Sequence, residues 1–258
     1  MRIRQWFVTA LLIGAVLLGG CSSQGSSPTA SPSAAATTAQ ASPAPVATPT
    51  PANTPTSGMA GLRRLQGKAT IEMVVKGSAI VIEVNGDDAP VTAGNFVDLV
   101  NQGVYNGLAF HRVIRQPEPF VVQGGDPQSK DPNFPIAQLG TGGYTDPATN
   151  APRYIPLEIK PEGATEPIYG QTLADAGVSD PPVLKHERGA VAMARSQFPD
   201  SASSQFYFAL ADLAFLDGSY AVFGKVTSGM EVVDQIEQGD RIETAKVTAG
   251  LENLQAAQ

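Results

Sequence analysis

Short runs of apolar and β-branched residues, separated by polar or glycine-rich turns, fill the chain from about Lys68 to its end. Apolar runs of this length, bounded by turn residues, predict β-strands. The first two runs cover 69–75 and 79–84 and predict a hairpin across Lys76-Gly77-Ser78. Further strands are predicted over 108–114, 120–125, 189–195, 205–210, 221–226 and about 242–248. The irregular stretch 127–188 predicts long surface loops with one strand over 154–159.

Two segments show helical spacing of their apolar residues instead. The first begins near Pro90 and Thr92, carries apolar positions at 96, 99 and 100, and ends at Gly103. The second is expected to begin at Ser228, because Glu231 follows at the spacing of a capping box. Its apolar face would hold positions 230, 233 and 236, and Gly239 would end it.

Many short strands with only two helices favour an all-β dominated fold, either a barrel or a sandwich. A parallel α/β arrangement would need helices between the strands, and the sequence does not supply them.

The N-terminus has a different pattern. In residues 1–20 two arginines precede an apolar run from about Trp6 to Leu18, and Gly19 and Gly20 follow it, which is the layout of a signal peptide. The apolar run is short for a membrane-spanning helix, which needs about 20 residues. An uncleaved or buried helix is the alternative.

The next residue is the only cysteine of the chain. The sequence Leu18-Gly19-Gly20-Cys21 resembles the lipobox of bacterial lipoproteins, in which this cysteine is lipidated and becomes the new N-terminus. The resemblance implies a chain that is exported and lipid-anchored to the outer face of a bacterial membrane. An unmodified thiol beside an ordinary cleavage site is the alternative.

The segment 21–62 follows as a predicted linker. It has no charged residue from Ser22 to Leu62 and is rich in Ser, Thr, Ala and Pro. Such a composition cannot bury a core, so we expect a disordered tether or stalk. A single patterned domain is then expected over 63–258.

Composition excludes several kinds of chemistry. The net charge is −7 and no Lys/Arg cluster is present, so nucleic acid is not an expected partner. One cysteine and two histidines cannot form a disulfide or a multi-histidine zinc site. No Walker loop, nucleophile elbow or HExxH motif occurs. We therefore expect no metal and no cofactor.

Three polar residues stand in apolar strands. Alternation places His111 and Arg112 on opposite faces of one strand, and Gln123 ends another. A lone histidine in such a strand is more often a packed core residue than a base. A buried guanidinium or amide needs partners, although an arginine exposed on the outer face fits the pattern equally well.

Eight segments together, in this order, resemble the cyclophilin family of peptidyl-prolyl cis-trans isomerases. They span about residues 68–258. They are Asn95-Phe96, FHRVI (110–114), FVVQGGD (120–126), GTGG (140–143), AMAR (192–195), SQFY (204–207), FLDG (215–218) and VFGKV (222–226). The resemblance implies a closed eight-stranded antiparallel β-barrel capped by two α-helices. It also implies an enzyme that rotates X-Pro bonds in secreted or surface proteins and assists their folding.

The resemblance assigns roles to single residues. Arg112 matches the family's catalytic arginine, and Ala194 and Arg195 match the stretch that binds the substrate backbone. The remaining matches to the substrate-binding pocket are Phe120, Val121, Gln123, Gln205, Tyr207, Phe215, Leu216 and Tyr220.

Three of these residues depart from the common pattern. Arg195 replaces an asparagine whose contact is usually through the main chain, so little harm is expected. Tyr207 replaces a phenylalanine and adds a hydroxyl. Phe215 replaces the tryptophan that helps to bind cyclosporin, which predicts weak cyclosporin binding.

Two other classes of function compete with the enzyme. The domain would be a non-catalytic module or chaperone that holds proline segments, or a structural surface protein on a stalk. The complete set of pocket residues favours the enzyme acting on proline-containing polypeptides. We further expect a monomer.

Overall fold

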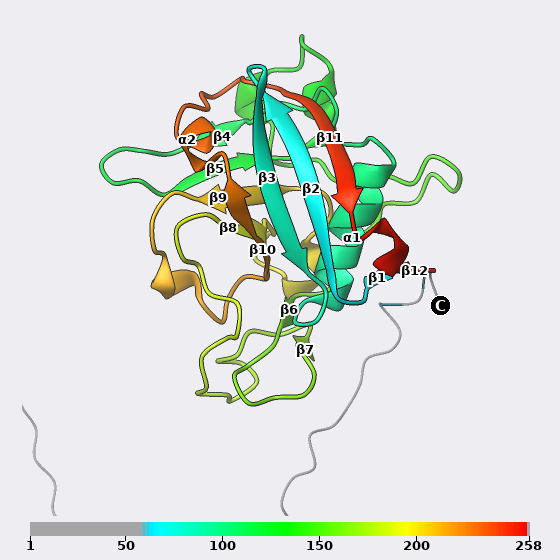
Figure 1. The fold of residues 1–258 in the computed structure, drawn as a ribbon, viewed down its shortest axis with the longest axis vertical. Coiled ribbons are helices and arrows are strands. Elements are labelled where there is room, and N and C mark those ends of the chain that lie inside the picture. The colour runs from blue at the N-terminus through cyan, green and yellow to red at the C-terminus, as the bar shows by residue number, and fades with distance from the viewer. Residues whose placement is uncertain (1–58, 60, 257–258) are drawn as a thin grey trace, which may run out of the picture. The chain divides into compact units, whose positions relative to one another are not determined.

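The computed structural model describes residues 59 and 61–256 (Figure 1). The predicted signal peptide 1–20, Cys21 and nearly all of the predicted linker 21–62 lie outside the described residues. Within the described residues, no helix has the length and apolar character needed to span a membrane.

One eight-stranded antiparallel sheet forms the body of the domain (Figure 1). Its strands lie in the order β11-β2-β3-β10-β8-β9-β5-β4. The predicted hairpin is confirmed and supplies the two long strands β2 and β3. The strands are β2 (Lys68–Val75), β3 (Ser78–Asn85), β4 (Arg112–Val113), β5 (Val121–Gly124), β8 (Ala190–Met193), β9 (Phe206–Ala209), β10 (Val222–Ser228) and β11 (Ile242–Ala249).

The sheet curls into a half-barrel, and its two edge strands, β4 and β11, are not paired with each other in the described part of the chain. The expected closed barrel is thus correct in strand number and direction but not in full closure. Four backbone hydrogen bonds between residues 107–110 and 239–242 span the opening beside an isolated bridge at Ala109 and Arg241. The predicted strand 108–114 is short because its first residues make this bridge instead of a ladder.

Two small two-stranded sheets accompany the main one among the described residues. The first pairs β1 (Arg64–Leu65) with β12 (Leu254–Gln255), and the second pairs β6 (Glu158–Ile159) with β7 (Ile168–Tyr169). The strand predicted over 154–159 is therefore present only at its last two residues. The described chain also contains the 3₁₀ turns η1 (Pro127–Lys130), η2 (Ile136–Gln138), η3 (Pro199–Ser201), η4 (Ala214–Leu216) and η5 (Leu251–Asn253).

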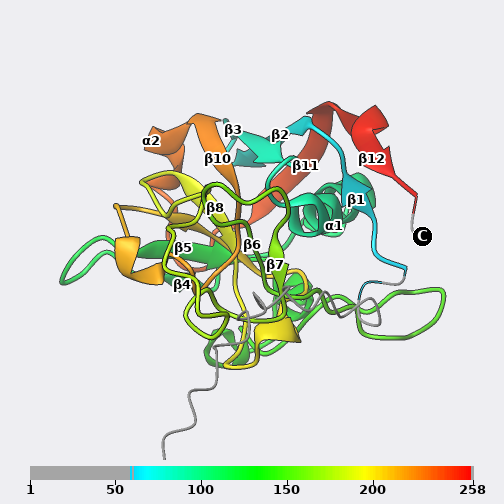
Figure 2. The ribbon, with the colours of Figure 1, turned by 90° about the horizontal axis from the view of Figure 1, so that it is seen from below.

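The first helix, α1 (Pro90–Asn101), forms as predicted. Figure 2 shows it end-on beside β1 and β11. Its first turn is held from outside the helix, because the buried Glu158 accepts hydrogen bonds from the backbone N–H groups of Val91 at 3.0 Å and Thr92 at 2.7 Å. A carboxylate at this position satisfies free amides and interacts favourably with the helix dipole.

The second helix is much shorter than predicted. α2 covers Met230–Val233, and its N-cap is Gly229 at φ 86°, with no side-chain cap. The expected capping box at Ser228 does not form because Ser228 is the last residue of β10. A Cβ on Gly229 would lie 2.4 Å from the carbonyl oxygen of Ala79, so only glycine fits there.

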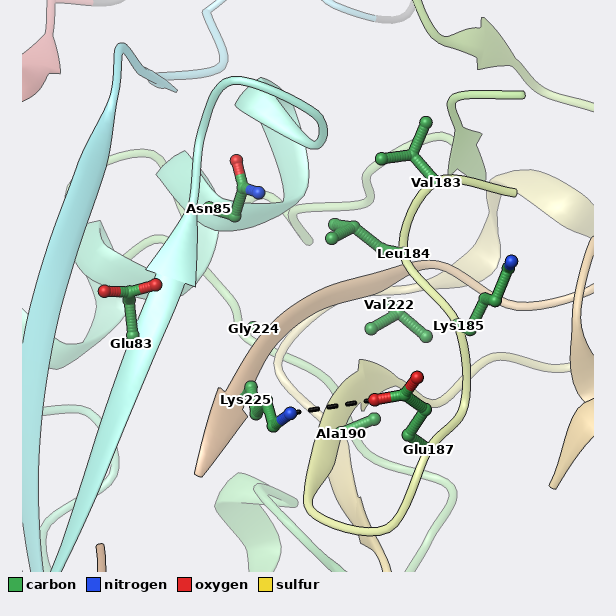
Figure 3. A pocket seen from close by; sticks show the side chains of 10 residues that line it. All are labelled: Glu83, Asn85, Val183, Leu184, Lys185, Glu187, Ala190, Val222, Gly224 and Lys225. Atoms are coloured by element: carbon green, nitrogen blue, oxygen red, sulfur yellow. Dashed lines mark ion pairs between the residues drawn. The ribbon is translucent and has the colours of Figure 1, made fainter. Parts of the chain in front are cut away.

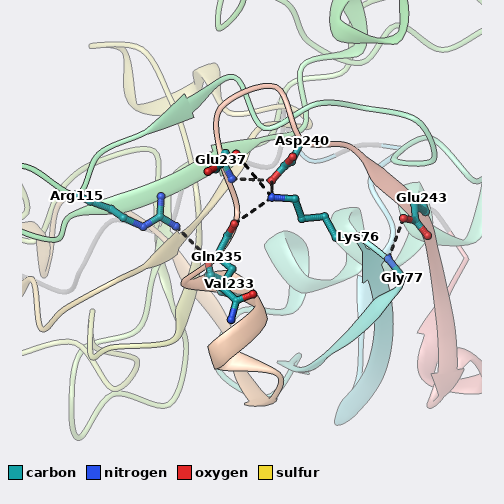
Figure 4. A network of polar contacts seen from close by, with 8 residues as sticks. All are labelled: Lys76, Gly77, Arg115, Val233, Gln235, Glu237, Asp240 and Glu243. Carbon is teal, nitrogen blue, oxygen red and sulfur yellow. Dashed lines mark hydrogen bonds and ion pairs between the residues drawn. The ribbon is translucent and has the colours of Figure 1, made fainter.

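Cations meet the carbonyl end of α2 (Figure 4). Arg115 donates from Nη2 to the Val233 carbonyl at 3.1 Å, and Lys76 donates from Nζ to the Gln235 carbonyl at 3.3 Å. Lys76 also pairs with Asp240 at 2.8 Å. These contacts add charged donors to carbonyls at the C-terminal end of the helix, where cations are favourable.

Strand alternation separates two apolar clusters on opposite faces of the sheet. Val122, Phe206 and Phe208 point into the main core, where they join Phe96 of α1 and Phe223 of β10. The intervening residues point outward into a second cluster, and this outer face carries the site described below. Its buried members are Val121, Ala190, Ala192, Tyr207, Ala209, Leu213 and Val222.

Candidate active site

Strand register assembles the centre of the site. Arg112 of β4 lies opposite Gln123 of β5, which lies opposite Tyr207 of β9, which lies opposite Ala192 of β8. Four residues distant in sequence therefore form one row across four strands. Because cross-strand neighbours have their side chains on the same face, the row projects to the outer face.

A cavity of about 160 Å³ lies over this row. Every residue that lines it is one that the sequence assigned to the site. The lining residues are Arg112, Phe120, Val121, Gln123, Ala194, Arg195, Tyr207, Leu216 and Tyr220. Gln205 and Phe215, the other two assigned residues, contact lining residues from behind and from the rim.

Arg112 is exposed, which is the second of the two alternatives that the sequence left open. Its guanidinium carbon lies 5.5 Å from the centre of the Phe120 ring, and Nη1 donates to Oε1 of Gln123 at 3.1 Å. The cation therefore stands beside the cavity with its donor fork held on one side and open to a ligand on the other.

A chain of amides holds this arrangement. Gln123 donates from Nε2 to Oε1 of Gln205 at 3.1 Å, and Gln205 donates from Nε2 to the Gly142 carbonyl at 2.7 Å. Each amide uses its oxygen as acceptor and its nitrogen as donor, so both amides have one orientation. The GTGG segment, which the resemblance singled out without a role, supplies the last acceptor.

Aromatic rings form the walls of the cavity. Phe120 stacks on Phe215 with centroids 6.0 Å apart and an interplanar angle of 18°. Phe215 is 72% exposed at the rim. Tyr207 and Tyr220 meet edge to face at 6.3 Å. A concave surface of aromatic rings bordered by two arginines suits a small apolar ring attached to a polar chain.

Arg195 uses its side chain as well as its main chain. The guanidinium lies 4.7 Å from the centre of the Tyr220 ring, and Nε and Nη2 donate to the Ser219 carbonyl at 3.2 and 2.8 Å. Nη1 bonds the Ser196 carbonyl at 2.9 Å. The side chain thus connects the two loops that border the cavity, a role that the sequence did not indicate.

His111 and Arg112 point to opposite faces, as alternation predicted. His111 is 7% exposed, and burial lowers the pKa of its imidazole. Neither ring nitrogen has a hydrogen-bond partner among the described residues. The residue packs on the inner side and does not line the cavity.

Sequence reasoning missed His186 and Asp217. His186 has a fully buried side chain and lies directly behind Tyr207, to which Nε2 is joined at 2.9 Å. Its Nδ1 is 2.8 Å from Oδ1 of Asp217. Asp217 belongs to the FLDG segment, so its place beside Leu216 was visible, but its link to a histidine 31 positions away was not.

A second hollow, of about 320 Å³, lies on the outer face between β3, β10 and the segment 183–187 (Figure 3). It contains none of the assigned residues. Two of its charged residues already form an ion pair, Lys225 with Glu187 at 3.6 Å. Both side chains are largely exposed. Although this hollow is larger, the first cavity holds the convergent polar and aromatic groups.

The fold and the cavity define a mostly-β protein with a peptide-sized site on the outer face of a curled antiparallel sheet. A family model described as "Cyclophilin type peptidyl-prolyl cis-trans isomerase/CLD" matches residues 70–253. The chain belongs to the cyclophilin family.

Relatives agree with this assignment. A putative thylakoid lumen peptidyl-prolyl cis-trans isomerase of Synechocystis sp. is 42% identical over 205 residues, covering 76% of this chain and 51% of the relative. Chloroplastic CYP38 of Arabidopsis thaliana is 38% identical, covering 74% and 44%. A probable isomerase of Brucella abortus is 36% identical, covering 69% and 76%. The chain thus spans about half the length of the first two relatives.

A solved structure supports the fold. The crystal structure of a cyclophilin-type peptidyl-prolyl cis-trans isomerase from Cryptosporidium parvum has a TM-score of 0.52 at 23% identity, with 70% of this chain and 98% of that chain covered. A second structure of that protein, in the presence of the dipeptide Ala-Pro, gives 0.51 at 24% identity, with 70% and 99% covered.

Proposed function

We propose that this chain is a peptidyl-prolyl cis-trans isomerase that accelerates rotation about X-Pro bonds. The observation that carries the proposal is the position of Arg112, held by Gln123 at the edge of a cavity walled by aromatic rings. Family membership and the names of the relatives support it.

The reaction needs no covalent intermediate. Resonance gives the X-Pro bond a rotation barrier of about 18–20 kcal/mol, and an enzyme lowers it by binding the twisted amide better than either planar form. Twisting ends the conjugation and leaves a lone pair on the prolyl nitrogen. The Arg112 guanidinium, always charged and with a rigid set of donors, would bind that nitrogen preferentially in the twisted state.

The other residues hold the substrate. The rings of Phe120 and Tyr207, with Leu216, would enclose the proline ring. Gln123 and the backbone of Ala194 and Arg195 would bind the polar chain on either side. Fixing both sides leaves the X-Pro bond as the one free rotation.

We infer that the substrates are proline-containing polypeptides. The second Cryptosporidium structure was obtained in the presence of the dipeptide Ala-Pro, and the cavity here has a volume suited to one proline ring. The accessible position of the cavity on the outer face fits a polypeptide that passes across it rather than a small molecule enclosed by it.

We also propose that the chain is exported and anchored by a lipid at Cys21. The sequence that ends at Cys21 supports this, and two relatives are named for the thylakoid lumen and the chloroplast. Substitution of Cys21 by serine should move the protein from the membrane fraction to the soluble fraction of cells, while the mature wild type gains the mass of its acyl chains.

The experiment for the activity uses proton exchange spectroscopy on an Ala-Pro peptide with the purified chain. Wild type should accelerate exchange, and Arg112→Ala should lower kcat/KM about 10²–10³-fold, as loss of one preorganised donor does elsewhere. Lys246→Ala removes an exposed cation of β11 and serves as control. A folded wild type without exchange activity would favour the non-catalytic binding module instead.

A further inference from the structure

The ring of Tyr207 lines the cavity, and its hydroxyl contacts a residue behind the cavity wall. The residue is 5% exposed, and its oxygen lies 2.9 Å from Nε2 of His186. The two rings are nearly parallel, at 14°, with centroids 6.1 Å apart. His186 is therefore in contact with a cavity residue while its own side chain is fully buried.

The other ring nitrogen fixes which atom carries the proton. Oδ1 of Asp217 accepts the backbone N–H of His186 at 2.8 Å and lies 2.8 Å from Nδ1. A carboxylate oxygen accepts from both groups, so Nδ1 carries hydrogen and donates. Burial lowers the pKa of the imidazole, opposed by Asp217, which leaves Nε2 without hydrogen at neutral pH.

It follows that the Tyr207 hydroxyl donates to Nε2. Burial also raises the pKa of the Tyr207 phenol, so the hydroxyl keeps its proton. Tyr207 thus donates to His186, and His186 donates to Asp217. The ring of Tyr207 is then fixed by a bond at its far end as well as by its position in β9.

The same contacts hold the loop that carries two other cavity residues. Asp217 directly follows Leu216, and the His186 carbonyl accepts the Leu213 N–H at 2.7 Å. One histidine thus connects β9 to both ends of the turn 213–217. A phenylalanine at position 207 would lack the hydroxyl and could not make this link.

We propose that His186 is a positioning residue of this isomerase, which orients Tyr207 and the 213–217 turn around the proline ring through the Tyr207–His186–Asp217 chain. The proposal rests on the proposed function and adds to it a group that does not contact substrate. His186 acts through Tyr207 and Leu216, so its removal should misplace the walls of the cavity rather than remove a reacting group.

Two substitutions separate the two bonds of His186. In His186→Asn the amide can donate to Asp217 in place of Nδ1 but does not reach Tyr207. In His186→Gln the longer amide can accept from the Tyr207 hydroxyl in place of Nε2. We expect kcat/KM to fall about tenfold in the asparagine variant and to be largely restored in the glutamine variant.

A double-mutant cycle tests whether the effect passes through the hydroxyl. The asparagine substitution leaves the buried Tyr207 hydroxyl without a hydrogen-bond partner, which is costly. Removing the hydroxyl together with the imidazole leaves no unpaired group and costs much less. His186→Asn should therefore cost less in a Tyr207→Phe background than in wild type. Asp98→Asn, a buried change on α1 whose bonds go to Arg63, Arg153 and Gln102, controls for loss of stability alone.

The chain has only two histidines, so nitrogen-15 spectra of histidine-labelled full chain resolve the tautomer directly. The proposal expects a proton on Nδ1 of His186 and none on Nε2 at neutral pH. The opposite tautomer would overturn the proposal. Equal losses of kcat/KM in the asparagine and glutamine variants, or no loss in either variant, would overturn it too. Additive effects in the double-mutant cycle would also contradict it. Absence of exchange in folded wild type would instead overturn the isomerase itself, and the spectrum would still report the Tyr207 contact.

Discussion

Arg112 and Gln123 lie directly opposite each other on neighbouring strands, and the arginine donates from Nη1 to Oε1 of the glutamine at 3.1 Å. Gln123 is itself held through Gln205 to the backbone of Gly142. The exposed guanidinium is thus oriented by a rigid strand pair rather than by a flexible loop. An exposed arginine alone would lose much of its advantage to side-chain motion.

Gln123→Leu keeps the approximate shape of the side chain but removes the acceptor for Arg112 and the donor to Gln205. We expect kcat to fall about tenfold with a smaller change in KM, because the loss concerns the orientation of the cation in the twisted state. Exchange spectroscopy over a range of peptide concentrations measures both constants. Gln138→Leu, at an exposed position of η2, is the matched control. An unchanged kcat in Gln123→Leu would show that Arg112 needs no such support.

Arg195→Ala should act on substrate binding more than on turnover. The side chain joins the loops on two sides of the cavity through the carbonyls of Ser219 and Ser196. Without it the loops gain freedom, and ordering them on binding costs about 0.5–1.5 kcal/mol per immobilised side chain, which corresponds to a several-fold rise in KM. Arg195→Lys keeps the charge without the two-pronged contact and should resemble the alanine variant. Lysine restoring KM would indicate that charge alone matters.

Phe215→Trp should strengthen cyclosporin binding. Phe215 is largely exposed and stacks on Phe120, so a larger ring at the rim adds contact area without changing the core. Aromatic contacts of this kind contribute about 0.5–1.5 kcal/mol, which predicts a Kd lower by up to about tenfold. Trp6 is the only tryptophan of the sequence, so the introduced indole also reports binding by fluorescence. Equal affinity in both proteins would place the determinant elsewhere.

Glu158→Gln should destabilise the domain. The two oxygens of the Glu158 carboxylate accept from two backbone N–H groups of α1. The glutamine side chain has only one oxygen, so one of these N–H groups would lose its acceptor. We expect the free energy of unfolding to fall by about 1–3 kcal/mol. Urea unfolding at pH 7 measures the loss. Glu166→Gln, an exposed change in the same segment, should leave the midpoint within error.

The pH dependence gives a second test of Glu158. Burial raises the pKa of its carboxyl above the ordinary 4.5, against the opposing hydrogen bonds from Thr92 and Val91. The folded state therefore holds this proton to higher pH than the unfolded state. Its contribution to stability is present below pH 4.5 and is lost as pH rises through the raised pKa. The glutamine variant should lack this fall, and parallel profiles for the two proteins would contradict the assignment.

Local patterns were sufficient for much of the fold. Alternation is clear in β2 and β3, which are buried at every second position over most of their length, whereas β5 and β9 were found as short apolar runs and are buried on both faces. The same rule placed Arg112 and His111 on opposite faces, but it did not decide which of the two points outward. The predicted capping box failed because Ser228 ends β10, and Gly229 at φ 86° takes the N-cap position of α2 in its place.

The contacts that no local pattern could reveal join distant segments. Glu158 bonds amides 66 and 67 positions away, and His186 meets Asp217 across 31 positions. Both lie in the stretch 127–188, whose sequence predicts mainly loops. The site residues themselves were found through resemblance, since composition and periodicity gave no reason to join Arg112 with Tyr220. The roles assigned to Arg112 and to the substrate-binding residues stay predictions until the variants are assayed.

The row of Arg112, Gln123, Tyr207 and Ala192 makes the site inseparable from strand pairing. A slip of one residue between any two of these strands would turn one member of the row to the opposite face. Substitutions elsewhere that keep this pairing thus keep the four side chains on one face, whereas the stretch 127–188 reaches the row only through single contacts, such as Gly142 on Gln205 and His186 on Tyr207. Descendants of such a chain can diversify the proteins they recognise by changing the border of the cavity, while the reacting centre is inherited with the sheet.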